Sequence, residues 1–175
     1  MIRTFLTLAC LLPSVGLSQG SAAKARAALA PFQRLVGVWE GDARVTLLPG
    51  APAQIVRQRE EFALGPGGTT MTVQMLARAT DGPQKGNVVF EASGTVSYDE
   101  QANKLRMRAK QAGGDSVEAT IEVRPDTLIW AIPMQGGRIR FTIAHSAADW
   151  HEVAHFIRDG AQPFQAMEMR LKKKQ

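Results

Sequence analysis

Cysteine is almost absent from this chain, since Cys10 is the only one among 175 residues. A single thiol excludes an intrachain disulfide framework. If the first 20 residues are removed, as argued below, the remaining chain has no thiol, which suits an oxidising compartment. The length fits one domain and is too short for two, and 45% hydrophobic residues are enough for a core.

The chain also lacks a basic stripe. Its net charge is +5 and its pI is near 9.8, but the basic residues are spread along the sequence, apart from Arg170 and the lysines at 172–174. Nucleic-acid binding favours basic residues gathered on one face and interleaved with aromatics. We therefore expect a solvated basic surface and no nucleic-acid partner.

The N-terminus has the layout of a secretory signal peptide. Arg3 precedes an apolar stretch at residues 4–17, and small residues follow, including Ser18 and Gly20. The stretch is too short for a stable membrane span. We expect residues 1–20 to be cleaved, which places the chain in the periplasm or outside the cell without an integral span. Lipid anchoring through Cys10 is an alternative, because Leu8-Ala9-Cys10 faintly resembles a bacterial lipoprotein site.

Helix-forming residues fill the next segment. Residues 21–34 are rich in alanine, leucine, lysine and arginine, which favours a short helix. Pro31 either ends this helix or begins a second short turn.

The hydrophobic period then changes to two. Ten strand-like runs follow, joined by nine turn-rich connections. In residues 104–110, for example, Leu105, Met107 and Ala109 alternate with lysine and arginine, as in a sheet with one apolar and one wet face. No helix-length segment separates the runs, which excludes parallel crossovers. Because ten strands in an open sheet would expose its edges, residues 35–173 are predicted to form an all-β, ten-stranded antiparallel up-and-down β-barrel, with the short N-terminal helix over one end.

Several short motifs carry a family resemblance. They are Gly37-x-Trp39-x-Gly41, Ser97-Tyr98-Asp99, residues 136–141 (GGRIRF), Trp150-His151-Glu152 and Arg158-Asp159-Gly160. Together with the ten runs, they resemble a family of secreted bacterial lipocalin-like proteins of unknown function, with a calycin-type barrel like that of nitrobindin or the fatty-acid-binding proteins. The resemblance implies that Trp39, on the first strand, packs across the closed barrel end.

The segment His151–His155 reads HEVAH and matches the zinc-peptidase pattern. On a helix, the two histidines would share a metal and Glu152 would act as the base. On a strand they would lie about 13 Å apart, too far for one zinc ion. No third histidine follows, and turn signals bracket the segment as they bracket its neighbours. We therefore expect a strand and no metal, and keep a zinc-dependent hydrolase using His151, His155 and Glu152 as the alternative.

Either face of this predicted strand could point into the barrel, because both carry apolar and polar residues. We expect Trp150, Glu152, Ala154 and Phe156 to point inward, because they include two large aromatics. Glu152 would then need a partner, such as Arg57, Arg59 or water, or would stay protonated. A structural salt bridge and a polar anchor for a ligand both remain open.

Large apolar residues supply the predicted interior. The predicted ligand-lining set is Trp39, Met75, Met107, Trp130, Phe141, Glu152, Phe156 and Met169. A methionine-rich lining suits a small hydrophobic molecule, although an ordinary core has the same composition.

Haem would require an inward histidine, for which His145 is the candidate. The predicted function is non-enzymatic binding of a small apolar ligand, with no cofactor. The alternatives are the zinc hydrolase and a structural envelope domain with a filled barrel.

Overall fold

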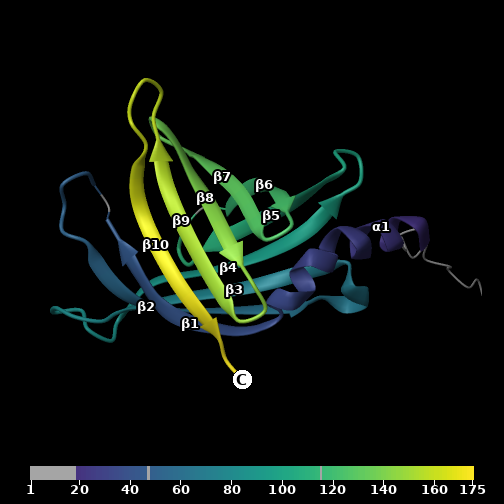
Figure 1. Ribbon diagram of the computed structural model, residues 1–175, viewed down its shortest axis with the longest axis horizontal. Coiled ribbons are helices and arrows are strands. Elements are labelled where there is room, and N and C mark those ends of the chain that lie inside the picture. The colour runs from purple at the N-terminus through teal and green to yellow at the C-terminus, as the bar shows by residue number, and fades with distance from the viewer. Residues whose placement is uncertain (1–18, 47, 115) are drawn as a thin grey trace, which may run out of the picture.

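The computed structural model describes residues 19–46, 48–114 and 116–175 (Figure 1). The helical elements are α1 (Gln19–Leu29), η1 (Ala30–Leu35) and η2 (Pro66–Gly68). The strands are β1 (Gly37–Val45), β2 (Gln54–Leu64), β3 (Thr70–Ala79), β4 (Val88–Asp99), β5 (Lys104–Gln111), β6 (Ser116–Arg124), β7 (Thr127–Met134), β8 (Gly137–His145), β9 (Asp149–Ile157) and β10 (Phe164–Lys173). The predicted signal peptide falls almost wholly on residues 1–18, which lie outside the described part of the chain, and cleavage stays a prediction.

The ten strands form one closed antiparallel barrel. Each strand pairs with its neighbour in sequence, and β1 pairs with β10 to close the cylinder. The predicted up-and-down barrel is therefore confirmed, with a calycin-like fold. No helix in the described residues is both long and apolar enough to cross a membrane.

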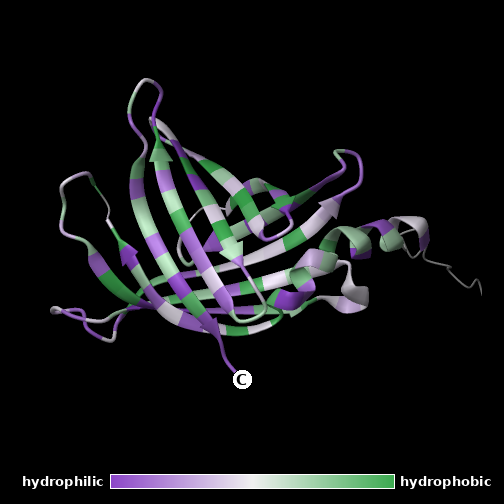
Figure 2. Cartoon of the chain, viewed as in Figure 1, coloured by the Kyte–Doolittle hydropathy of each residue, from purple (hydrophilic) through white to green (hydrophobic). Residues whose placement is uncertain are grey.

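Apolar and polar side chains alternate along the strands, so the interior of the barrel is apolar and its outer surface is exposed to solvent. In β5 buried and exposed residues alternate, with Leu105, Met107 and Ala109 inside. Figure 2 shows the same alternation of apolar and polar residues along most strands. Such a period of two leaves one face of each strand for the core.

The N-terminal segment closes one end of the barrel. α1 ends at Leu29, and η1 continues with Pro31 in its first turn, where a missing backbone N–H costs little. The side chains of Leu29, Phe32 and Leu35 are buried in the barrel core. Figure 1 shows these helical turns at one end of the cylinder. We call this the capped end and the opposite one the open end.

Trp39 occupies the position that the resemblance implied. Its side chain is fully buried, and its indole Nε1 donates a hydrogen bond to the carbonyl oxygen of Leu35 at 2.7 Å. Lys173 Nζ lies 5.5 Å from the centre of the Trp39 ring and donates to the carbonyl oxygen of Arg34 at 2.9 Å. The first strand, the last strand and η1 are thereby held together at the capped end.

Gly41 allows β1 to press closely against β10. A Cβ atom at this position would lie 1.9 Å from the carbonyl oxygen of Arg170. No side chain fits at that distance, so the second glycine of the Gly37-x-Trp39-x-Gly41 motif is required for close strand packing.

The wall is weakest between β6 and β7. Only three residue pairs join these strands, from Glu122↔Ile129 to Arg124↔Thr127, all near the capped end. Every other neighbouring pair of strands is joined by at least six residue pairs. Toward the open end β6 and β7 therefore separate, and their facing backbone groups do not pair with each other.

Candidate functional site

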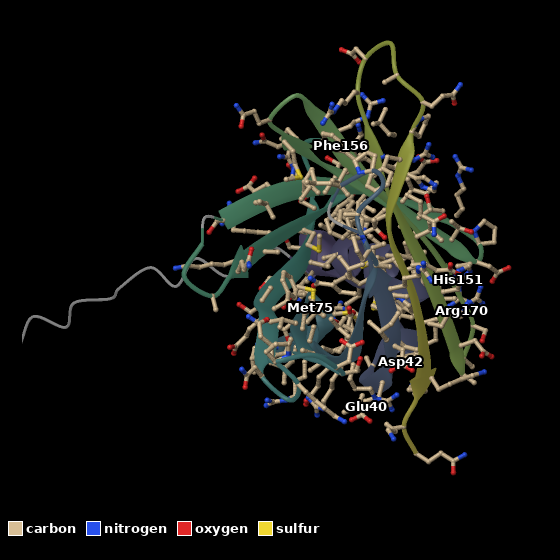
Figure 3. All side chains as sticks on the ribbon, turned by 90° about the vertical axis from the view of Figure 1, so that its left-hand side faces the viewer. Glu40, Asp42, Met75, His151, Phe156 and Arg170 are labelled. Carbon is tan, nitrogen blue, oxygen red and sulfur yellow. The ribbon has the colours of Figure 1, made fainter. Side chains whose placement is uncertain are left out.

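A small cavity lies inside the capped half of the barrel. Its volume is about 70 Å³. It is lined by Phe32, Leu35, Glu60, Phe62, Val73, Met75, Val96, Met107, Ile121, Leu128, Trp130, Ile143, Trp150 and Glu152. The lining is apolar except for two carboxyl groups. Phe32 and Leu35 of η1 line the cavity on its capped side. Figure 3 looks toward the open end, with Met75 and Phe156 labelled on the ribbon.

Half of the predicted lining residues border this cavity: Met75, Met107, Trp130 and Glu152. The other four lie elsewhere in the barrel. Trp39 is packed at the capped end and Met169 is buried in the core. Phe141 stacks on Trp130 with ring centres 4.0 Å apart, and Phe156 lies nearer the open end, beneath the guanidinium of Arg158.

The face of β9 that we expected to point inward does so. Trp150, Glu152 and Ala154 are buried, whereas His151 and His155 alternate with them on the outer side. The Trp150 ring packs against Phe62, with centres 5.4 Å apart. Glu152 is therefore an interior carboxyl, as predicted.

The predicted cationic partners of Glu152 are wrong. Arg57 and Arg59 alternate with the buried residues of β2 and lie on the outer surface, where Arg57 bonds Asp42 and Arg59 bonds Glu61. Val56 and Phe62 fix this orientation, because both are buried and they are six residues apart on one face of the strand.

The same alternation places Gln58 and Glu60 inside, which sequence reasoning missed. The available signal was the even spacing of Val56, Gln58, Glu60 and Phe62. It was obscured because Ile55 and Ala63 suggest the opposite face. Glu60, at 5% exposure, is as deeply buried as Glu152.

Each interior carboxyl accepts one hydrogen bond from its own strand. Gln58 Nε2 donates to Glu60 Oε1 at 3.3 Å, and Trp150 Nε1 donates to Glu152 Oε2 at 3.1 Å. Within the described residues, Glu60 Oε2 and Glu152 Oε1 have no hydrogen-bond partner. Because a carboxyl group offers about four acceptor positions, most of their capacity is unused.

Burial shifts the titration of both carboxyls from the acidic range to near neutral pH. Burial raises the pKa of Glu60 from 4.5 to about 7, against the opposing hydrogen bond from Gln58. Burial, followed by the charge of Glu60, raises the pKa of Glu152 from 4.5 to about 8, against the hydrogen bond from Trp150. Each group can therefore donate as well as accept a hydrogen bond in this range.

The geometry required for a zinc site is not present in HEVAH. His151 and His155 lie on a strand, and His151 Nε2 is 3.0 Å from Glu168 Oε1 on the outer face of the neighbouring β10. In the described part of the chain, no three histidine, cysteine or acidic residues are grouped to hold a metal ion. Hence His151 is explained by its contact with Glu168 on the outer surface.

The haem alternative does not fit the interior. His145 is buried at the capped end, 6.4 Å from the Trp150 ring, and does not line the cavity. Neither of its ring nitrogens has a hydrogen-bond partner. Burial, followed by the charge of Arg34, lowers its pKa. A cavity of about 70 Å³ is far too small for a porphyrin.

The outer wall of β1, β2 and β10 has a broader, charged depression of about 510 Å³. Figure 3 labels Glu40, Asp42 and Arg170 along it. Its acidic groups are paired with cations; Lys174, for example, is 3.1 Å from Glu40. This depression is an ordinary ion-paired barrel surface, since exposed pairs of this kind contribute little to stability or recognition on their own.

Comparison with solved structures supports the fold. The chain superposes on the crystal structure of Rv2717c from M. tuberculosis with a TM-score of 0.63 and 13% identity, covering 85% of this chain and 98% of that one. A mutant of the fluorescent protein UnaG matches with a TM-score of 0.44 and 13% identity, over 82% and 98% of the two chains. No family model and no curated protein matches the sequence. The match to Rv2717c supports the barrel fold, and membership of a secreted bacterial family stays a prediction.

Proposed function

We propose that this barrel binds a small, largely apolar molecule in its interior and does not catalyse a reaction. The observation that carries the proposal is the apolar cavity with two underused carboxyl groups in its wall. Binding sites of this kind combine an apolar lining with a few polar groups that orient the ligand. Trp39 and η1 close the far end, so the ligand would enter from the open end.

The ligand would extend from the cavity toward the open end. As it stands the cavity is smaller than the roughly 300 Å³ of a usual ligand pocket, so it would hold only one end of the molecule. Met75 and Met107 in its wall have flexible side chains that can rearrange. Phe90 and Met134, on inward-facing positions near the open end, are 37% and 49% exposed. These apolar side chains would contact the remainder of the ligand.

The separation of β6 from β7 would widen the entrance at the open end, because these strands are unpaired from that end to the cavity wall. Trp130 lies just past the last residue pair of this seam and also lines the cavity. Opening there breaks no ladder hydrogen bond, because the strands are already unpaired beyond Glu122 and Ile129.

Filling the cavity tests this function. Val96 lines the cavity on β4, and Val89 is 41% exposed on the same strand. We expect Val96→Phe to weaken binding of the fluorescent apolar probe N-phenyl-1-naphthylamine tenfold or more, and Val89→Phe to leave it unchanged. Absence of saturable binding by the unmodified protein, or equal binding by all three proteins, would refute the proposal.

A structural domain with a filled interior is the second candidate. The small size of the cavity favours it, since about 70 Å³ has room for only a few water molecules. This candidate predicts that Val96→Phe changes stability and that no apolar probe binds with saturation. The same fluorescence titration therefore separates the two functions.

We also propose that the protein acts in the periplasm or outside the cell. The N-terminal sequence supports export through its Arg3, apolar and small-residue order. Mass spectrometry of the protein from a bacterial periplasmic fraction should give a chain that begins near Ser21. A diacylated cysteine at Cys10 would indicate lipid anchoring instead, and an intact N-terminus in the cytoplasm would contradict export.

A further inference from the structure

The ionisable groups that line the cavity are all acidic. The lining has two carboxyls, Glu60 from β2 and Glu152 from β9, and no lysine, arginine or histidine. Each carboxyl has one engaged oxygen and one oxygen without a partner among the described residues. The donors Gln58 and Trp150 are already used by these carboxyls. In their ionised forms, the two carboxyls therefore offer a ligand unused acceptor capacity.

The nearby cations are held away from this space. Arg57 and Arg59 pair with acidic residues on the outer surface. At the capped end, Arg34 donates to the carbonyl oxygen of Pro125, and Lys173 lies over the Trp39 ring. An anionic ligand would meet two acidic groups without a counter-charge in the cavity wall.

We infer that the polar end of the ligand is an amine, bound as an ammonium group between Glu60 and Glu152, with its apolar tail toward the open end. This inference rests on the proposed binding function. An ammonium group has three N–H donors and no acceptor, which matches two carboxyls with free oxygens. Hydrogen bonds between opposite charges are also stronger than neutral ones. The head group is small enough for a cavity of about 70 Å³.

Proton release gives the inference a second readout. In the free barrel, burial holds the pKa of Glu60 at about 7 and that of Glu152 at about 8. An ammonium group would favour their ionised forms, so binding near pH 7 should release about one proton. Other titratable or charged groups near the capped end include His145 on β8, Arg34 on η1, Asp126 in the turn between β6 and β7, and Lys173 on β10. None of these four lines the cavity.

The test compares three ligands with one tail: octylamine, 1-octanol and octanoate, titrated by calorimetry at pH 7 in two buffers of different ionisation enthalpy. We expect octylamine to bind at least tenfold tighter than octanol and at least a hundredfold tighter than octanoate. The double variant Glu60→Gln/Glu152→Gln should lose at least tenfold in octylamine affinity and keep octanol within threefold. Its proton release should also disappear.

The control is Glu61→Gln, on the exposed face of the same strand, which should bind octylamine like the unmodified protein. Circular dichroism checks that each variant is folded. Octanol binding without a preference for octylamine, or octylamine binding that survives the double substitution, would overturn the amine assignment and leave the binding function standing. Failure of all three ligands to bind would overturn both.

Discussion

Glu152→Gln should flatten the pH dependence of stability. The glutamine keeps the shape of the side chain and a carbonyl oxygen for the Trp150 indole, but it cannot ionise. In the folded protein, burial and then the charge of Glu60 raise the pKa of Glu152 from 4.5 to about 8. The folded state therefore holds a proton that the unfolded state loses as the pH rises above 4.5, and stability falls over this range.

The size of the effect follows from this difference in pKa. Each pKa unit corresponds to about 1.4 kcal/mol, so keeping the Glu152 carboxyl protonated costs about 4 kcal/mol at pH 7.5 and less than about 1 kcal/mol at pH 5. Between these two pH values, the free energy of unfolding of the unmodified protein should fall by about 3 kcal/mol more than that of Glu152→Gln. Glu60 titrates in both proteins, and because its charge also raises the pKa of Glu152, part of the difference reports the interaction between the two carboxyls.

Urea unfolding followed by tryptophan fluorescence at pH 5 and pH 7.5 measures this difference. Glu118→Gln is the control, since Glu118 is exposed on β6 and pairs with Arg108 on the outer surface. Its stability should follow that of the unmodified protein at both pH values. If Glu152→Gln did so as well, the carboxyl would be ionised and solvated in the folded state, and the argument from burial would be wrong.

Three further substitutions test other parts of the structure. Gly41→Ala should lower the free energy of unfolding by ~3 kcal/mol or more, because its Cβ would lie 1.9 Å from the Arg170 carbonyl oxygen; a smaller loss in urea unfolding would show that β1 can move. Trp39→Phe should cost about 1–3 kcal/mol, because the buried Leu35 carbonyl loses its indole donor, and an unchanged thermal midpoint would contradict that bond. His151→Ala should leave the zinc content by plasma emission spectrometry unchanged and below one per chain, whereas stoichiometric zinc lost on substitution would restore the metal site.

The barrel was predictable because its signal is repeated in most strands. Alternation such as that of Leu105, Met107 and Ala109 indicates a one-sided sheet, and the turn-rich connections exclude crossover helices. The cap was predictable from local chemistry, since Pro31 can begin a helical turn but not continue one. Each of these features depends on neighbours in sequence, which a single chain displays directly.

The site was harder to predict because it depends on which face of each strand points inward. On β9, the two large aromatics Trp150 and Phe156 correctly indicated which face points into the barrel. On β2 the apolar residues fall on both faces, with Ile55 opposing Val56, so the charged residues could not be assigned. The separation of β6 from β7 had no signal either, since both runs have ordinary strand composition and pairing is a property of the closed barrel.

The buried acids are the residues least explained by the fold. A carboxyl group without a cationic partner makes a folded protein less stable above its usual pKa, and an apolar side chain of similar size at Glu60 or Glu152 would avoid that cost. The barrel needs neither group for closure, because Trp39, Gly41 and the strand register provide it. Local choices that weaken a fold without a structural gain are expected at functional positions. This is why we propose that these two carboxyls bind the polar end of the ligand and that the surrounding methionines and aromatics form the wall that desolvates it.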